Sequence, residues 1–284
     1  MKRCAFLTLH DPTGYVIDDE HARAPLRALQ CEMEMVPWDR QGVAWEDYAI
    51  VVIRSPWDWV HAPERFLDVL AGIDARAQLQ NPLAIVRWNL DKTYLRELAA
   101  RGVAIVPTIY RDRMGPGEVD ALLRELGTRE AVVKPVVACN AEGAHRLPER
   151  GAEAVETYFA ARASMTQPFV RSVIDEGEYS LFFFDGQYSH AVRKVPKAGD
   201  FRVQEEHGGA IESVRASASL REAAQAVIAA VGTELLYARV DLVRGDRDAW
   251  WLMKLEAVEP SLYLRMDPDA PERFARAIVR RLGS

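Results

Sequence analysis

The sequence has few cysteines and no long apolar run. It contains three cysteines in 284 residues, Cys4, Cys31 and Cys139. An odd number of widely spaced cysteines provides neither a disulfide framework nor the paired spacing of a zinc site, and it is typical of a reducing compartment. No stretch reaches the length of a transmembrane helix, and the apolar run near the N-terminus is shorter than that of a signal peptide. We therefore expect a cytoplasmic protein without a membrane partner.

The sequence also lacks a surplus of basic charge. Lys and Arg number 36 against 42 Asp and Glu, which gives a formal net charge of −6. Proteins that bind nucleic acid through its phosphates need clustered basic residues, and the sequence has no such cluster. We expect a globular protein with no nucleic-acid partner. The net charge does not exclude a local basic pocket that binds a small anionic ligand.

Strand and helix patterns alternate in the first third of the chain. The expected elements are, in order, the strand Cys4–Leu9, the helix Asp18–Gln30, and the strands Cys31–Trp38 and Tyr48–Ile53. A β-α-β-β order is typical of a small α/β domain, and ligands of such domains usually bind at the carboxyl ends of the strands.

A polar and aromatic loop, RSPWDW, follows the third of these strands. Arg54, Asp58 and the two tryptophans beside them suit a small zwitterionic substrate. The alternative is a capped turn with packed tryptophans, and the residues alone favour neither interpretation.

Two lysines lie where an unpaired charge is costly. Asn89–Gly102 predicts a helix with Asn89 as its N-cap, and Lys92 lies in the first turn, where the helix dipole disfavours a cation. Lys134 interrupts the apolar strand Ala131–Val137, and buried lysines are rare unless they are paired. Lys134 therefore favours an anionic ligand, whereas Lys92 could equally be an ordinary exposed lysine.

Two loops have the composition of ligand-binding segments. The loop 138–145 follows the strand with Lys134 and could fold over phosphates through its backbone N–H groups, but a single glycine makes this a weak signal. Lys197–Gly209 is polar, bounded by glycine and basic at its start, with Arg202 near its centre. This second loop predicts a mobile active-site segment.

The segment 237–264 contains two apolar runs joined by a polar turn, which predicts a β-hairpin. If the loop is Asp246–Ala249, Asp241 lies opposite Lys254 and diagonal to Glu256, at about 7–8 Å. A six-residue loop would instead separate the two carboxylates by about 13 Å. A metal site therefore depends on the register, and a simple pair of Asp241 with Lys254 is the alternative.

In their order and spacing, these segments resemble the ATP-grasp ligases, and within them the glutathione-synthetase-like branch. The order is a helix with Lys92, a strand with Lys134, then MTQPFV, EGEYSLFFFDG, GDFRVQEEHGG, RVDLV and LMKLEAVEP. The blocks RSPWDW, RWNLDK, SHAVRKVPKAGDFRVQEEHGG and LEAVEPSLYL are similar to those of the cyclo-ligases of cycloserine biosynthesis. The resemblance covers nearly the whole chain.

The resemblance implies an α/β fold with α+β subdomains. An N-terminal α/β domain would span residues 1–85, and a two-subdomain ATP-grasp fold would follow at 86–166 and 167–284. It also implies ATP and Mg²⁺ as cofactors and an amino-acid-like carboxylate that is activated as an acyl-phosphate and attacked by an amine. Amide formation and ring closure are both open, and the frequency of dimers among such ligases makes a homodimer possible.

The resemblance also implies a role for each site residue. The residues implied to bind the nucleotide are Lys92, Lys134, Gln167, Phe169, Val170 and Glu178. The lysines would hold the phosphates, the next three residues the adenine, and the glutamate the ribose. The residues implied for the remaining roles are Arg202 for catalysis, Asp241 and Glu256 for magnesium, and Arg54, Asp58, His190 and Lys194 for the substrate.

One position departs from the family pattern. Lys254 stands where the family usually has an acidic metal ligand, and a protonated lysine cannot bind magnesium. Two hypotheses follow: an ATP- and magnesium-dependent ligase, or a degenerate ATP-grasp protein that binds nucleotide without turnover, as a sensor or partner-binding module. Lys254 favours the second hypothesis, and the other retained site residues favour the first.

Overall fold

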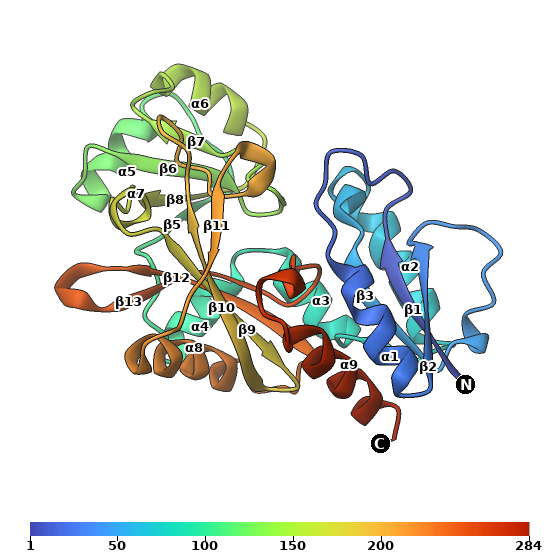
Figure 1. The fold of residues 1–284 in the computed structure, drawn as a ribbon. Helices are drawn as coiled ribbons and strands as arrows, with labels where there is room; N and C mark the ends of the chain where they lie inside the picture. Colours follow the sequence, from blue (N-terminus) through green and yellow to red (C-terminus); the bar gives the residue numbers. More distant parts are fainter. Residues whose placement is uncertain (284) are drawn as a thin grey trace.

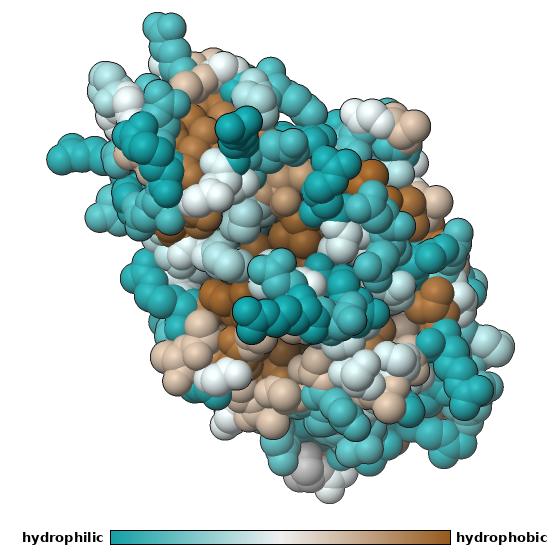
Figure 2. Space-filling view, turned by 90° about the vertical axis from the view of Figure 1, so that its left-hand side faces the viewer, coloured by the Kyte–Doolittle hydropathy of each residue, from teal (hydrophilic) through white to brown (hydrophobic). Residues whose placement is uncertain are grey.

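Three β-sheets with surrounding helices make up the computed structural model, which describes residues 1–283 (Figure 1). The first sheet lies on the right of Figure 1, and the second lies at the upper left, above the third. Hydrophilic side chains cover most of the face in Figure 2, and hydrophobic side chains show mainly in its recesses. No helix within residues 1–283 is both long enough and apolar enough to span a membrane.

The first sheet is parallel, with the order β2-β1-β3-β4. Its strands are β1 (Lys2–Thr8), β2 (Cys31–Pro37), β3 (Ile50–Ser55) and β4 (Leu79–Gln80). The α-helices that connect them are α1 (Arg23–Ala28) and α2 (Pro63–Asp74). Strand β3 is buried along its whole length, as expected for a parallel strand that is covered on both faces.

The second sheet is antiparallel, with the order β5-β8-β6-β7. Its strands are β5 (Ile109–Arg111), β6 (Ala131–Pro135), β7 (His145–Leu147) and β8 (Ser164–Pro168). Helices α5 (Glu118–Leu126) and α6 (Ala152–Phe159) cover one face, where Val133 of β6 joins their apolar core. Side chains alternate along a strand, so Val132 and Lys134 of β6 point away from this core.

The third sheet is antiparallel, with the order β11-β10-β9-β12-β13. Its strands are β9 (Glu178–Phe184), β10 (Gln187–Val195), β11 (Ala210–Ser213), β12 (Tyr237–Arg244) and β13 (Trp250–Glu256). Helix α8 (Ala218–Val231) packs on one face together with α4 (Tyr94–Ala100). Alternation places Val240 and Leu242 on this apolar face and Asp241 on the other.

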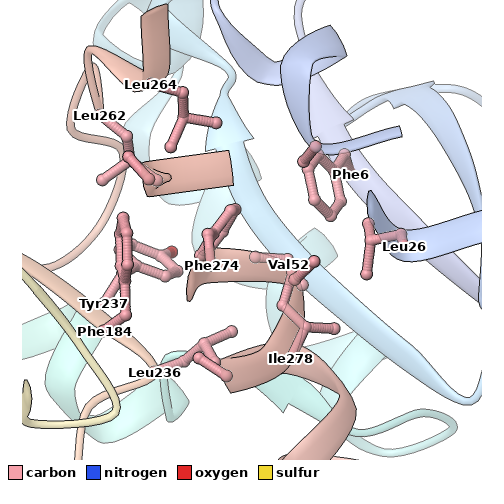
Figure 3. Close-up of a cluster of buried hydrophobic side chains, with 14 of the residues drawn as sticks. Phe6, Leu26, Val52, Phe184, Leu236, Tyr237, Leu262, Leu264, Phe274 and Ile278 are labelled. Carbon is pink, nitrogen blue, oxygen red and sulfur yellow. The ribbon is translucent and has the colours of Figure 1, made fainter. Parts of the chain in front are cut away.

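Helix α9 (Ala270–Arg281) joins the first and third sheets. Figure 3 shows Phe274 of α9 between Phe6 and Val52 on one side and Phe184 and Tyr237 on the other. The ring centroids of Phe274 lie 6.0 Å from Phe6 and 5.0 Å from Phe184. The two sheets therefore share one apolar core.

A buried amide adds a polar connection between the same two sheets. Asn81 follows β4, is wholly buried, and donates from Nδ2 to the carbonyl oxygens of Tyr237 (2.9 Å) and Ala257 (2.8 Å). Its Oδ1 accepts the N–H of Leu236 at 2.7 Å. All hydrogen-bonding groups of this amide except one lone pair are thus used, which fixes the N-terminal part of the chain to the third sheet.

The predicted helix Asn89–Gly102 is correct only in its second half, because one helix ends at Leu90 and a new helix begins at Tyr94. The two helices are α3 (Leu83–Leu90) and α4, and Lys92 lies in the link between them. Asn89 does not cap a helix: its Nδ2 donates to the Leu255 carbonyl at 3.0 Å, and its Oδ1 accepts the Ala257 N–H at 2.7 Å. These long-range hydrogen bonds determine its position.

The β12–β13 hairpin has a loop of neither expected length, and its pairing at Asp241 is that of the first of the two expected registers. The loop runs from Gly245 to Ala249, because Arg244 pairs with Trp250, and it is one residue longer than the shorter of the two expected loops. A register shift after Asp241 compensates, so that Asp241 still lies opposite Lys254. The bulge thus preserves the arrangement that a four-residue loop would have given.

In chain order, the last strands of the three sheets end at residues 80, 168 and 256. The predicted domain limits at residues 85 and 166 fall inside α3 and β8, and these limits stay a prediction.

Candidate active site

An open cavity of about 1260 Å³ lies between the second and third sheets. Strands β6 and β8 form one wall, and β9 and β13 form the other, with segments 138–144 and 201–204 at the edges. All the residues predicted to bind nucleotide line it, namely Lys92, Lys134, Gln167, Phe169, Val170 and Glu178. Arg202 and Glu256 line it as well.

Two lysines of this cavity have no counter-ion. Lys92 Nζ donates to the Ala138 carbonyl at 2.7 Å, and Lys134 Nζ lies 4.0 Å from Met253 Sδ. Within residues 1–283, neither ammonium group has a carboxylate within 4.0 Å. Burial is the larger cause and repulsion from neighbouring lysines the smaller one, and together they lower the pKa of Lys92 to about 8 and that of Lys134 to about 7. An anion beside them would relieve this repulsion.

The connection after β8 offers backbone groups to the cavity. The Gln167 side chain donates from Nε2 to Thr108 Oγ1 at 2.9 Å, and the Phe169 N–H donates to the Glu130 carbonyl at 2.9 Å. The Phe169 carbonyl and the Val170 N–H make no hydrogen bond with any part of the chain that the structure describes. This carbonyl and N–H are a free acceptor and a free donor beside the cavity.

The third sheet brings a row of charges together through its register. Glu178 of β9 pairs with Lys194 of β10, and the two side chains form a buried ion pair. Lys194 Nζ also lies 3.5 Å from Asp241 Oδ1. Asp241 is completely buried, and it accepts hydrogen bonds from Ser180 and from the Arg239 guanidinium, whose Nη2 lies 2.9 Å from Oδ2.

The two predicted magnesium ligands are both engaged by cations. Although burial raises the pKa of Asp241, Arg239, Lys194 and Lys254 together hold it well below its usual range. Glu256 forms ion pairs with Lys254 and with Arg239, whose Nη2 lies 2.8 Å from Oε1. In residues 1–283, no three His, Cys, Asp or Glu side chains form a cluster that could hold a metal ion.

Glu259 is a site residue that the sequence analysis missed. Its Oε1 accepts the Trp59 indole N–H at 2.8 Å, and its carbonyl accepts the Trp57 indole N–H at 2.8 Å. Burial and the charge of Glu256 raise the pKa of Glu259 to about 7. The available signal was its place three residues after Glu256 in LEAVEP. The tryptophans of the RSPWDW loop thus position an acid of the site.

A second cavity of about 480 Å³ adjoins the first. Lys254, Glu256 and Glu259 line both cavities, so these charges lie at the border between them. The second cavity is also lined by Lys194 and by Tyr263, which has a left-handed backbone (φ +45°). Strained residues of this kind cluster at functional sites.

Arg54, one of the predicted substrate residues, lies in neither cavity. It is buried, its Nε is 3.0 Å from Asp19 Oδ1, and its Nη2 donates to the Pro260 carbonyl at 2.8 Å. Its guanidinium also lies 5.0 Å from the centre of the Tyr237 ring. Arg54 therefore connects β3 to the segment after β13 and has no contact with either cavity.

Asp58 and His190 are also outside the cavities. Asp58 accepts the Trp38 indole N–H at 2.7 Å. His190 stacks on Phe182 with ring centroids 4.3 Å apart, and its Nε2 lies 3.0 Å from the Leu262 carbonyl. Burial lowers its pKa to about 4. Of the four predicted substrate residues, only Lys194 borders a cavity.

The Lys197–Gly209 loop contributes residues 201–204 to the edge of the cavity and is anchored by ion pairs. Arg202 forms a two-point ion pair with Asp200, at 2.8 Å between Nη2 and Oδ2. Farther along, Glu205 pairs with Arg265 at 2.6 Å, and Arg265 pairs with Asp18 of the N-terminal segment at 2.7 Å. The loop is thereby tied to the N-terminal part of the chain.

Solved structures with a similar fold define the class of protein. The crystal structure of D-cycloserine synthetase DcsG matches 99% of this chain and 99% of its own chain, with a TM-score of 0.87 and 32% identity. D-alanine–D-alanine ligase from Bacillus anthracis matches 99% of this chain and 97% of its own, with a TM-score of 0.70 and 15% identity. The fold is that of the ATP-grasp ligases, as the sequence predicted.

Sequence relatives narrow this class. Residues 4–81 match the family described as the N-terminal domain of D-cycloserine synthetase DcsG. The chain is 35% identical over 278 residues to the cycloserine biosynthesis protein DcsG of Streptomyces lavendulae, with 90% of this chain and 91% of that protein covered. The chain therefore belongs to the DcsG family of ATP-grasp carboxylate–amine ligases, and it is an enzyme.

Proposed function

We propose that this enzyme uses ATP to convert a small amino-acid-like carboxylate into an acyl-phosphate, which an amine then attacks to form an amide or to close a ring. The observation that carries the proposal is that the ammonium groups of Lys92 and Lys134 lie in a cavity without a carboxylate partner from the described chain, and that this cavity adjoins a second, smaller one. The first cavity would hold the nucleotide and the second the carboxylate substrate.

The nucleotide would lie along the wall between β6 and the connection after β8. Its phosphates would neutralise Lys92 and Lys134. Its adenine would hydrogen-bond to the free Phe169 carbonyl and Val170 N–H, next to Gln167. Glu178 would accept the ribose hydroxyls while Lys194 holds its carboxylate in place.

Phosphoryl transfer needs positioning and charge neutralisation more than covalent help from the protein. Arg202 lines the nucleotide cavity, and its guanidinium would turn from Asp200 toward the developing acyl-phosphate. Arginine suits this task, because its planar guanidinium binds two oxygens at once.

Carboxylate oxygens are the ligands that Mg²⁺ prefers, usually from one or two side chains plus phosphates. Of the two predicted metal ligands, Glu256 borders both cavities, whereas Asp241 is completely buried behind cations. Glu256, with Glu259 beside it, would hold a magnesium ion at the border between the cavities. The ion would supply positive charge to the phosphates.

The second cavity is lined mostly by charged and polar side chains, among them Lys194, Arg239 and Glu256, and such a lining suits the charged groups of an amino-acid derivative. The similarity to a cycloserine biosynthesis protein makes ring closure of an amino-acid derivative the first reaction to test. The alternative of nucleotide binding without turnover has no support among the relatives, which are named as synthetases and ligases.

Thermal unfolding with a non-hydrolysable ATP analogue and Mg²⁺ tests the nucleotide site. A ligand at 100 times its Kd should raise Tm by about 5–10 °C. Lys134→Met should abolish most of this rise, whereas Lys2→Met, which removes an exposed lysine far from the cavity, should retain it. The absence of any shift in the unmodified protein would contradict the proposal.

A further inference from the structure

Lys254 occupies the space between two carboxylates on the wall of both cavities. Its Nζ forms an ion pair with Glu256 and lies 3.7 Å from Asp241 Oδ2. The side chain is about one-quarter exposed, and that exposed part borders the two cavities. Its ammonium is thus both held by carboxylates and open to a ligand.

The surroundings leave little room for a metal ion between these carboxylates. Arg239 contacts both oxygens of Asp241 and also Glu256, and Lys194 approaches Asp241 from the side of β10. Magnesium needs oxygen ligands at about 2.0–2.1 Å in octahedral geometry. The lone pairs of Asp241 are already directed at two N–H groups and a hydroxyl. The Arg239 guanidinium and the Lys254 ammonium both bridge the two acids, and of these two cations Lys254 is the one that borders both cavities.

Three ammonium groups converge on the nucleotide cavity. Lys92, Lys134 and Lys254 all line it, and the charge of Lys254 contributes to the lowered pKa of the other two. Lys254 is held in place by carboxylates, whereas no carboxylate of residues 1–283 lies within 4.0 Å of either of the other two ammonium groups. A polyanion in the cavity would therefore meet a fixed positive charge at the border with the second cavity.

We propose that Lys254 acts as a built-in cation that contacts the nucleotide phosphates and takes the place of one divalent metal ion. This inference depends on the nucleotide site proposed above. Exchanging a lysine for a carboxylate changes the charge of the site by two units, which is the charge of one magnesium ion. The enzyme would then bind its nucleotide appreciably without a divalent metal, and Mg²⁺ would add to that binding through Glu256.

Calorimetric titration of a non-hydrolysable ATP analogue, with EDTA and with excess Mg²⁺, tests this proposal. The unmodified protein should bind in EDTA within about tenfold of its affinity in Mg²⁺. Lys254→Gln should lose more than tenfold in EDTA and less in Mg²⁺. Lys254→Arg, which retains the charge, should keep the metal-free binding. Arg247→Gln, on the exposed loop of the same hairpin, is the matched control and should behave as the unmodified protein.

Counting bound Mn²⁺ by electron paramagnetic resonance provides an independent readout. With saturating analogue, Lys254→Glu should bind one Mn²⁺ more than the unmodified protein. Equal numbers of bound Mn²⁺ in Lys254→Glu and the unmodified protein would overturn the proposal. So would an unchanged ratio between the affinity in EDTA and the affinity in Mg²⁺ when Lys254→Gln is compared with the unmodified protein. Nucleotide binding that requires Mg²⁺ in the unmodified protein would overturn it too, while leaving the nucleotide site in place. No binding in either condition would refute the proposed function itself.

Discussion

Nucleotide binding to this enzyme should take up protons, because the two cavity lysines have lowered pKa values. The pKa is about 7 for Lys134 and about 8 for Lys92 in the nucleotide-free protein. Phosphates next to an ammonium group stabilise its charged form and raise its pKa. Each lysine that is neutral before binding therefore gains a proton when the nucleotide enters.

The size of this uptake follows from the two values. At pH 8, Lys134 would be about 0.9 neutral and Lys92 about 0.5 neutral, which gives an uptake of about 1.4 protons per nucleotide. The same arithmetic gives about 0.6 at pH 7 and about 0.1 at pH 6. By linkage, the affinity should fall about tenfold between pH 7 and pH 8, because the free protein binds fewer protons than the complex over that range.

Calorimetry in two buffers of different ionisation enthalpy measures the uptake directly. The non-hydrolysable ATP analogue is titrated at pH 6, 7 and 8. The analogue's own phosphate titrates near pH 6, and on binding it would release protons, which is the opposite sign. Lys2→Met should retain the full uptake as a surface control. Proton release at pH 8, or an uptake that does not grow between pH 6 and pH 8, would refute the reasoning.

Three further predictions concern the framework around the site. Gly143→Ala should lower the free energy of unfolding, measured by urea titration, by about 1–3 kcal/mol, because the new Cβ would lie 2.5 Å from Tyr158 Oη and the backbone φ is +68°. Gly115→Ala is the control and should lower it far less, because no atom lies within 4 Å of a Cβ at that position. Asn81→Ala should cost about 3 kcal/mol in the same assay, since it strands buried backbone groups that now hydrogen-bond to the amide. Arg265→Gln breaks two ion pairs of the Lys197–Gly209 loop anchor, so limited proteolysis should cut this loop several times faster, and an unchanged rate would show that the anchor does not hold it.

Local patterns were sufficient where the site depends on strand alternation. The period of two in the last hairpin predicted the residues that share a face with Asp241 and those that share a face with Lys254, whereas the register between the strands was left open and is set in the structure by a bulge after Asp241. The charge of Lys134 in an apolar strand predicted an anionic ligand, and the side chain lines the cavity without a carboxylate partner among residues 1–283. Both inferences need only neighbouring residues, and neighbouring residues determine alternation.

Contacts between residues far apart in the chain explain what could not be predicted. Asn89 has the sequence context of a helix cap, but hydrogen bonds to residues 255 and 257 determine its position. Arg54 and His190 have the chemistry of substrate ligands, yet their partners are the carbonyls of Pro260 and Leu262. Glu259 gains its role from two indoles about 200 residues earlier. No local pattern carries such information.

Trapping with hydroxylamine shows whether ATP activates a carboxylate as an acyl-phosphate in this enzyme. The enzyme is incubated with ATP, Mg²⁺, hydroxylamine and a panel of amino-acid derivatives, and ADP, AMP and hydroxamate are quantified. We expect ADP and hydroxamate in equal amounts, only with a suitable carboxylate, and far less of both for Arg202→Gln. AMP in place of ADP, or ADP formed without hydroxamate at every carboxylate, would contradict this activation.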